Sequence, residues 1–286
     1  MTPTTIARGE NDGFFKAPLP FVEPSPRRVR VKFGGAIIAD SKRPLLLSQY
    51  GPGQLPGYLP TYYFPQEDVR MDALASSVPN GQDDIVAYHT IRIGDHVADH
   101  AAWIVQNPPA EMAALHTYVS FTWERMDAWY EEEEEVFVHA RDPHSRVDVL
   151  ASARHVRVMI AGETVAETHR PHLLFETTLP TRYYIPREDV RMDLLTPTKH
   201  TSQCPFKGIA QYWSVTLGGR TFDNIVWSYP NPIPENPKIR DLLCFFNERV
   251  DLFIDGEFQP RPLTPWSEDG PEGMEAFLVT KTIHQS

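Results

Sequence analysis

Three residue types that could do chemistry lie close together in the stretch 200–208, which reads His-Thr-Ser-Gln-Cys-Pro-Phe-Lys-Gly. A cysteine becomes a nucleophile when a neighbouring base or cation lowers its pKa, and His200 and Lys207 lie near enough in the chain to serve Cys204 in this way. The simpler interpretation is a buried, unreactive cysteine at a tight Cys-Pro corner. A metal site made by His200, Cys204 and a carboxylate is a third interpretation, but the spacing matches no established metal motif. We therefore predict neither a metal nor another cofactor.

Lys207, which Gly208 follows, suits an anionic ligand because its ammonium is a compact point charge. The residues around it do not form a P-loop, which needs an earlier glycine and a following Ser or Thr. A surface lysine before a turn glycine is the alternative. If the protein is an enzyme, His200 or Asp193 would move protons.

Aromatic residues on or beside expected strands could form the wall of a pocket, since pockets are mostly apolar with a few placed polar groups. Tyr183 and Tyr184 are consecutive, so they point to opposite faces of a strand and only one needs to pack in the core. The sequence predicts a pocket lined by Tyr184, Arg191, His200, Cys204, Lys207, Trp213 and Tyr229.

The chain is a tandem repeat. Residues 62–74 (YYFPQEDVRMDAL) return with few changes as residues 183–195 (YYIPREDVRMDLL). Other matching pairs follow in the same order, which indicates duplication: residues 29–44 with 156–171, 88–94 with 212–218, Trp103 with Trp227, and 124–127 with 248–251.

The two copies differ where the candidate chemistry lies. In place of residues 200–208 the first copy has Pro79–Asp84 (PNGQDD), so we expect the second copy to bear the site. Arg191 and Asp193 recur as Arg70 and Asp72, which favours a structural ion pair over catalysis for these two residues.

Each copy is predicted to be mainly β with one helix. Residues 29–33 alternate apolar and charged side chains, and Gly34-Gly35 offers a hairpin turn before residues 37–39. Residues 212–217 and 225–227 form a second expected hairpin. A helix is expected around residues 112–123 and again around residues 239–250, where apolar residues recur at helical spacing.

The repeat divides the chain into an N-terminal extension (1–24), a first unit (25–140), a second unit (150–262) and a tail (263–286). The seam follows the five glutamates Glu131 to Glu135, which we interpret as a solvated strand edge, with a docking site for a basic partner as the alternative. Residues 276–283 in the tail could add a strand.

Composition excludes some function classes. The formal net charge is -11, which argues against nucleic-acid binding and against attachment to an anionic membrane surface. Two cysteines make no disulfide framework, and neither a secretory signal nor a membrane-spanning run is visible, so we expect a cytoplasmic protein.

The pattern YYxPxEDVRMDLL, followed by HTSQCPFKGIAQYWSV and WSYPNP, resembles the DUF427 family, which also carries a nucleotidyltransferase-like label. The resemblance covers roughly residues 25 to 262 and includes the tandem arrangement. It implies a small curved β-sheet module similar to the Mss4-like, or β-tent, fold, and it implies little about chemistry. Many β-tent proteins hold zinc with two Cys-x-x-Cys pairs, which this chain lacks, so each module must depend on its apolar core.

Three hypotheses about function follow. The first is a small-molecule-binding protein, or an enzyme, acting on a small polar or anionic metabolite in the second unit. The second is a non-catalytic module that docks a protein partner. The third is nucleotidyl transfer, which normally needs clustered carboxylates for magnesium; Asp189 and Asp193 are available, but the first copy has equivalent aspartates. The sequence fixes neither the substrate nor the oligomeric state.

Overall fold

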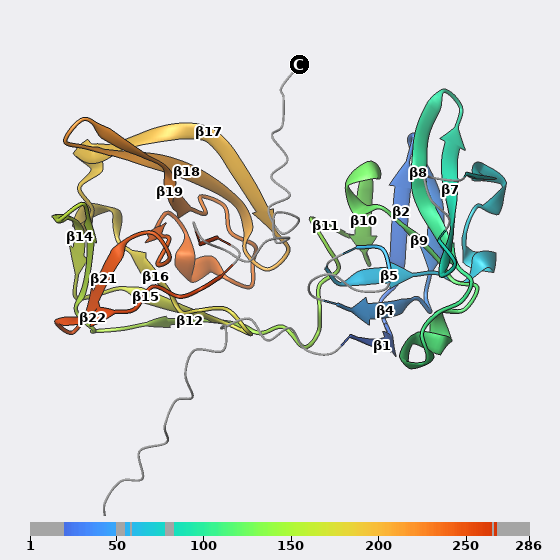
Figure 1. Ribbon diagram of the computed structural model, residues 1–286, viewed down its shortest axis with the longest axis horizontal. Coiled ribbons are helices and arrows are strands. Elements are labelled where there is room, and N and C mark those ends of the chain that lie inside the picture. Colours follow the sequence, from blue (N-terminus) through green and yellow to red (C-terminus); the bar gives the residue numbers. More distant parts are fainter. Residues whose placement is uncertain (1–19, 50–54, 58, 78–82, 265, 268–286) are drawn as a thin grey trace, which may run out of the picture. The chain divides into compact units, whose positions relative to one another are not determined.

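The structure is a computed structural model that describes residues 20–49, 55–57, 59–77, 83–264 and 266–267 (Figure 1). Its contacts divide the chain into two compact units, with the boundary between Pro143 and His144. Strands dominate both units, which confirms the predicted mainly β class. No helix in the described ranges is both long and apolar enough to cross a membrane. The predicted strand at residues 276–283 lies outside these ranges.

The described part of the first unit forms three antiparallel sheets. The sheet with order β1-β4-β5 is built from β1 (Phe21–Pro24), β4 (Leu45–Ser48) and β5 (Thr61–Tyr63). The sheet with order β11-β10-β2-β3 is built from β2 (Val29–Phe33), β3 (Ala36–Ser41), β10 (Ala128–Glu131) and β11 (Glu134–Val136). The sheet with order β6-β7-β8-β9 is built from β6 (Leu74–Ser76), β7 (Val86–Ile93), β8 (His96–Val105) and β9 (Val119–Phe121).

The second unit has a similar arrangement, but its strands form two sheets, one of seven strands and one of four. The larger sheet runs in the order β12 (Val147–Ala151), β15 (His172–Glu176), β16 (Arg182–Ile185), β20 (Leu243–Phe245), β19 (Arg220–Ser228), β18 (Gly208–Leu217) and β17 (Leu195–Cys204). The smaller sheet runs in the order β14 (Glu163–Thr168), β13 (Val156–Ile160), β21 (Asp251–Ile254) and β22 (Glu257–Gln259). In Figure 1, β17 and β18 form a long, curved hairpin.

Both predicted hairpins are present. The turn between β2 and β3 is made by Gly34 and Gly35, which both have positive φ, the conformation that tight hairpin turns require and that glycine adopts without strain. The turn between β18 and β19 is made in the same way by Gly218 and Gly219.

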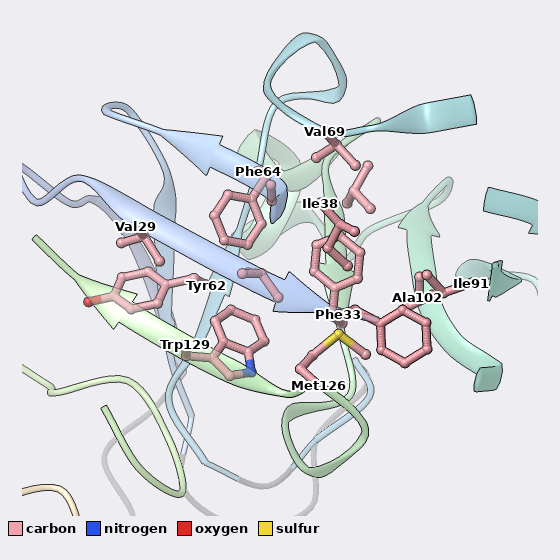
Figure 2. Packing of buried hydrophobic residues seen from close by; sticks show 14 of the residues in the cluster. Val29, Phe33, Ile38, Tyr62, Phe64, Val69, Ile91, Ala102, Met126 and Trp129 are labelled. Atoms are coloured by element: carbon pink, nitrogen blue, oxygen red, sulfur yellow. The ribbon is translucent and has the colours of Figure 1, made fainter. Parts of the chain in front are cut away.

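In each unit one hydrophobic cluster packs between the sheet that contains the β2–β3 or β13–β14 hairpin and the remaining strands of the unit. Figure 2 shows this cluster in the first unit, which includes Val29 and Ile38 from the β2–β3 hairpin together with Phe64, Ile91 and Ala102. The second unit has an equivalent cluster that includes Val156, Val165, Ile185, Trp213 and Val226. Burial of this apolar surface is the main stabilising contribution in each unit.

The prediction of a helix around residues 112–123 and around residues 239–250 is wrong. Every helical segment in the described residues is a short 3₁₀ turn, including Ala110–Leu115 and Pro237–Ile239. The residues that follow these turns extend into β9 and β20 and pair within the sheets. Prolines at positions 108 and 109, and at 230, 232, 234 and 237, favour turns because proline lacks an amide hydrogen. Strand pairing of the apolar residues therefore outweighs their helical spacing.

The repeated EDVRMD motif folds in the same way in both units. It forms two successive 3₁₀ turns, Gln66–Asp68 with Met71–Ala73 in the first unit and Arg187–Asp189 with Met192–Leu194 in the second. Asp189 accepts a hydrogen bond from the Thr168 hydroxyl at 2.7 Å, and Asp68 accepts one from the Ser41 hydroxyl at the same distance. The best-matched segment of the repeat is therefore a structural brace in both units.

The glutamate run is only partly the solvated edge that we predicted. Glu131 is buried, and its carboxylate accepts hydrogen bonds from the Tyr62 hydroxyl at 2.9 Å and the Arg141 amide at 2.9 Å. Glu132 has positive φ in the turn between β10 and β11, and the residues after it are exposed. The run therefore consists of one buried carboxylate, that of Glu131, and four exposed glutamates in the hairpin that follows.

Candidate functional site

Lys207 is positioned by the tight turn that connects β17 to β18. Pro205 suits the second position of such a turn because its φ is fixed, and the Lys207 amide donates to the Cys204 carbonyl at 3.3 Å. Gly208 then begins β18 with φ of +103°, a conformation that other residues rarely adopt.

The loop after β19 packs against this turn and is hydrogen-bonded to it. The Asn236 side-chain amide donates to the Phe206 carbonyl at 2.7 Å, and the Ile233 amide donates to the Lys207 carbonyl at 3.2 Å. A side chain at Gly208 would approach the Asn231 carbonyl to 3.1 Å. The WSYPNP stretch and the CPFKG turn therefore form one packed unit.

The side chain of Lys207 is buried against Glu176, at the end of β15. Its ammonium Nζ lies 2.5 Å from Oε2 of Glu176, and the two side chains are only 12% and 9% exposed. Burial opposes the charged ammonium, but the acidic groups beside it, Cys204 and Glu176, outweigh burial and raise the pKa of Lys207. The lysine is therefore charged and held in place.

A second buried ion pair lies in the same unit. The Arg182 guanidinium donates to both carboxylate oxygens of Glu248 at 2.7 Å, and the side chains are 8% and 0% exposed. The guanidinium also lies 5.5 Å from the ring centre of Trp227 and 5.4 Å from that of Trp266. Although burial works against the carboxylate, its hydrogen bonds with Arg182 lower the pKa of Glu248.

The first unit does not form these two pairs at the matching positions. Gln49 occupies the position of Glu176, because Leu45 pairs with Tyr63 as His172 pairs with Tyr184. Thr61 precedes the paired tyrosines where the second unit has Arg182. Glu124 matches Glu248 but is exposed. The two buried ion pairs of the second unit are therefore not repeated at the matching positions of the first unit, which instead buries Glu131 beside Arg27 at 3.1 Å.

Near the two ion pairs lies a buried cluster that is rich in aromatic residues, which we call the tyrosine cluster. Its buried members are Val149, Leu174, Tyr184, Ala210, Tyr212, Trp227, Tyr229, Ile239, Cys244 and Phe246. Burial raises the pKa of Tyr212, while the charges of Lys207 and Arg182 act in the opposite direction. Tyr212 therefore lies within electrostatic reach of both cations.

The equivalent cluster in the first unit is less polar. It consists of Leu47, Leu55, Tyr63, Val86, Trp103, Val105, Met112 and Leu115. Tyr184 and Trp227 repeat a pair found there: the indole of Trp227 donates to the Tyr184 hydroxyl at 3.2 Å, as Trp103 does to Tyr63 at 3.4 Å. Tyr184 therefore has a structural role in both units, whereas Tyr229 takes the place of Val105.

His200 lies at the edge of the tyrosine cluster. In β17, Thr198, Lys199 and His200 stand opposite Tyr212 alone, so the strand bulges at this point. The His200 ring meets the Tyr212 ring edge-on at 4.5 Å, and the Tyr212 hydroxyl is 2.7 Å from the Ser202 hydroxyl. Burial lowers the pKa of His200, so at neutral pH the ring is uncharged and can accept a proton.

Cys204 lies beside Lys207 but is not activated. Burial raises the pKa of its thiol, an effect that the positive charge of Lys207 only partly offsets. The thiol form therefore predominates at neutral pH, and the environment does not favour a nucleophile.

Three of the predicted site residues, counting Asp193 as a possible proton carrier, do not lie with the others. Arg191 and Asp193 form an ion pair at 2.7 Å with side chains that are 56% and 61% exposed, as Arg70 and Asp72 do at 2.8 Å. Trp213 packs in the cluster that joins the sheets, because it alternates with Tyr212 along β18. The structure brings together Tyr184, His200, Cys204, Lys207 and Tyr229.

Reasoning from the sequence missed Glu176, Arg182 and Glu248, which make the buried ion pairs. A signal was present for the first two, since each is a charged residue on a mainly apolar strand where the first copy has a neutral one, Gln49 and Thr61. Glu248 gave no such signal, because Glu124 matches it in the first copy.

An open depression in the described part of the first unit is lined by Arg28, Asp40, Lys42, Arg43 and Asp68. Arg28 pairs with Asp40 at 2.6 Å, and Arg43 pairs with Glu67 at 2.7 Å. These charges are largely exposed and water screens them, so the depression is a weaker candidate than the buried cluster.

Comparison with protein families gives two matches along the chain. The model of a domain of unknown function (DUF427) matches residues 21–132 and again residues 148–256. Comparison with curated proteins found no match.

Proposed function

Since this chain belongs to the DUF427 family and holds two copies of its domain, we propose that it binds, or acts on, a small polar or anionic metabolite in its second unit. The main support is the pair of buried ion pairs, Lys207–Glu176 and Arg182–Glu248. Burying charge is costly, and the first unit builds the same fold with the neutral Gln49 and Thr61 at the positions of Glu176 and Arg182. Strongly perturbed ionisable groups gather at functional sites.

The chemistry of the cluster suggests what the ligand offers. Lys207 has three hydrogen-bond donors, of which Glu176 takes one, so the ammonium can also bind a carboxylate or phosphate oxygen. Tyr212 and Tyr229 provide aromatic surface and hydroxyls beside it. A small metabolite with an acidic group and some apolar surface fits these residues.

If the protein is an enzyme, His200 is the residue best suited to move a proton. Its pKa is lowered by burial, which leaves an acceptor nitrogen at neutral pH, and it contacts Tyr212. Lys207 would orient the anionic group of the substrate. The proposal includes a cytoplasmic location, which the composition suggests.

The test is a thermal-shift screen of metabolites and nucleotides, with and without magnesium. The test variant is Lys207→Met/Glu176→Gln, which neutralises the buried pair without leaving one charge alone. The matched control is Arg70→Met/Asp72→Asn, which neutralises an exposed pair in the first unit. A ligand present at about 100 times its Kd stabilises the native state by about 2.7 kcal/mol.

We expect a ligand that stabilises the wild type and the control and leaves the test variant unchanged. Equal stabilisation of all three proteins would place the ligand elsewhere. A nucleotide that stabilises only with magnesium would favour nucleotidyl transfer.

A protein-interaction module is the second candidate. Leu150 on β12 and Phe175 on β15 are exposed, and they lie on the same face because Asp148 pairs with Phe175 and Leu150 with Leu173. β12 is also an edge strand of its sheet, which leaves backbone groups open to a partner strand. A screen without any stabilising ligand would favour this candidate.

A further inference from the structure

A short segment after β22 folds back on itself beside the second unit. We call residues 262–264 and 266–267 the strap. The Thr264 amide donates to the Ser267 hydroxyl at 3.0 Å, and the Ser267 amide donates to the Thr264 carbonyl at 3.0 Å. The Trp266 amide donates to the Thr264 hydroxyl oxygen at 3.2 Å. These hydrogen bonds hold the strap in a turn.

The strap covers the ion pair between Arg182 and Glu248. The Thr264 hydroxyl donates to Oε1 of Glu248 at 2.6 Å, and Thr264 is buried. The Trp266 ring lies over the Arg182 guanidinium and packs against the tyrosine cluster. Arg249 donates to the Trp266 carbonyl at 2.9 Å. The strap thus supplies one hydroxyl and one flat ring to the buried pair.

The strap lies outside the segment that matches the family. The family match to the second unit ends at residue 256, before the strap begins. In the first unit the position of Arg182 is held by Thr61, and Glu124 is exposed, so the pair that the strap covers is not formed there. The strap therefore accompanies the pair of Arg182 and Glu248.

We propose that the strap is a displaceable cover of the second-unit site, and that its opening admits the ligand to Arg182 and Glu248. This inference rests on the proposed function for the identity of the site. Within the described residues the strap pairs with no strand, and side-chain contacts with Glu248, Arg249 and Arg182 attach it to the unit. Segments held in this way open at lower free energy than the sheets. A ligand with a hydroxyl donor and a planar group would replace the contacts that the strap gives up.

Amide hydrogen exchange on the full chain without ligand tests the strap independently of any ligand. The amides of Trp266 and Ser267 report on the strap, and the amide of Leu252 in β21 reports on the sheet. We expect the strap amides to exchange at least about 100-fold faster than Leu252. Thr264→Val removes the hydroxyl at nearly constant volume and should speed exchange in the strap about tenfold, without changing Leu252.

The matched control is Thr216→Val, which removes an exposed threonine hydroxyl of β18 and should leave strap exchange unchanged. Strap amides as slow as Leu252 would overturn the proposal. So would a Thr264→Val variant that speeds exchange equally in the strap and in β21, because the strap would then be part of the cooperative core. Failure of the metabolite screen would instead contradict the proposed function, and it would not affect this exchange result.

Discussion

At the scale of single residues, the two units differ most in where they bury charge. Lys207 and Arg182 each have a carboxylate partner within hydrogen-bonding distance, so neither cation is left alone in an apolar environment. A lone buried charge would be far more costly than a paired one. Partnered burial lets the second unit keep fixed charges beside three tyrosines without losing its fold.

Cys204 gives a prediction at this scale. Because burial raises its pKa, the fraction of thiolate at pH 7 is small, and it rises only above the usual pH range of a thiol. We expect iodoacetamide to modify Cys204 about tenfold or more slowly than free cysteine at pH 7.5, with a rate that climbs as the pH increases.

Cys204→Ser is the control, since the remaining Cys244 is buried and its pKa is raised to about 12. That variant should take up almost no label. Labelling of Cys204 that is faster than free cysteine at pH 7.5 would contradict this account and restore the nucleophile interpretation.

Much of the residue-level site could be predicted from the sequence. The sequence difference between the two copies indicated His200 and Lys207. The alternation of side chains along a strand predicted that Tyr183 and Tyr184 face opposite ways, and they pack in different clusters. Trp213 could not be assigned in this way, because the face to which it points depends on the register of β18. The register becomes visible only once the strands are paired.

At the scale of elements, the turn between β17 and β18 holds the candidate site in place. Lys207 sits at its end, and the loop around Asn236 packs against it through hydrogen bonds to Phe206 and Lys207. The bulge at Thr198 to His200 then directs the histidine toward Tyr212.

Gly208 gives a prediction at the scale of this turn. Gly208→Ala should destabilise the protein by about 2 kcal/mol or more, because the new methyl group meets a backbone carbonyl at 3.1 Å in addition to the strain of a positive φ. Chemical denaturation measures the change.

Gly219→Ala is the matched control, since Gly219 has φ of +78° and open space around it. It should lose only the strain, about 1 kcal/mol. Equal losses of unfolding free energy in the two variants would show that the loop does not restrict the space at Gly208.

Elements were predicted well where the signal was local. Gly34-Gly35 and Gly218-Gly219 marked hairpin turns, and both are present. The expected helices around residues 112–123 and 239–250 were wrong in type, because β9 and β20 pair with distant strands. Helical spacing in a short apolar run cannot reveal such long-range pairing.

At the scale of the whole molecule, duplication supplies an internal control. Both units share the brace made by Thr168 and Asp189 or by Ser41 and Asp68, and both share the tyrosine–tryptophan pair. The second unit adds the ion pairs Lys207–Glu176 and Arg182–Glu248, neither of which the first unit forms at the matching positions, and the strap covers the second of them. Features that both units share are the ones that the fold uses. Features that the second unit has in addition define the candidate site.

The central claim is that the second unit keeps its buried charges for binding and not for stability. The most direct test is the free energy of unfolding of Lys207→Met, Glu176→Gln and the double variant, measured by chemical denaturation in the absence of any ligand. Each single change leaves one buried group without its partner and should cost about 3–5 kcal/mol. The double variant should be as stable as the wild type, or more stable by about 1 kcal/mol or more. A double variant that loses as much stability as the single variants would contradict the claim, because the ion pair would then be a structural element of the fold.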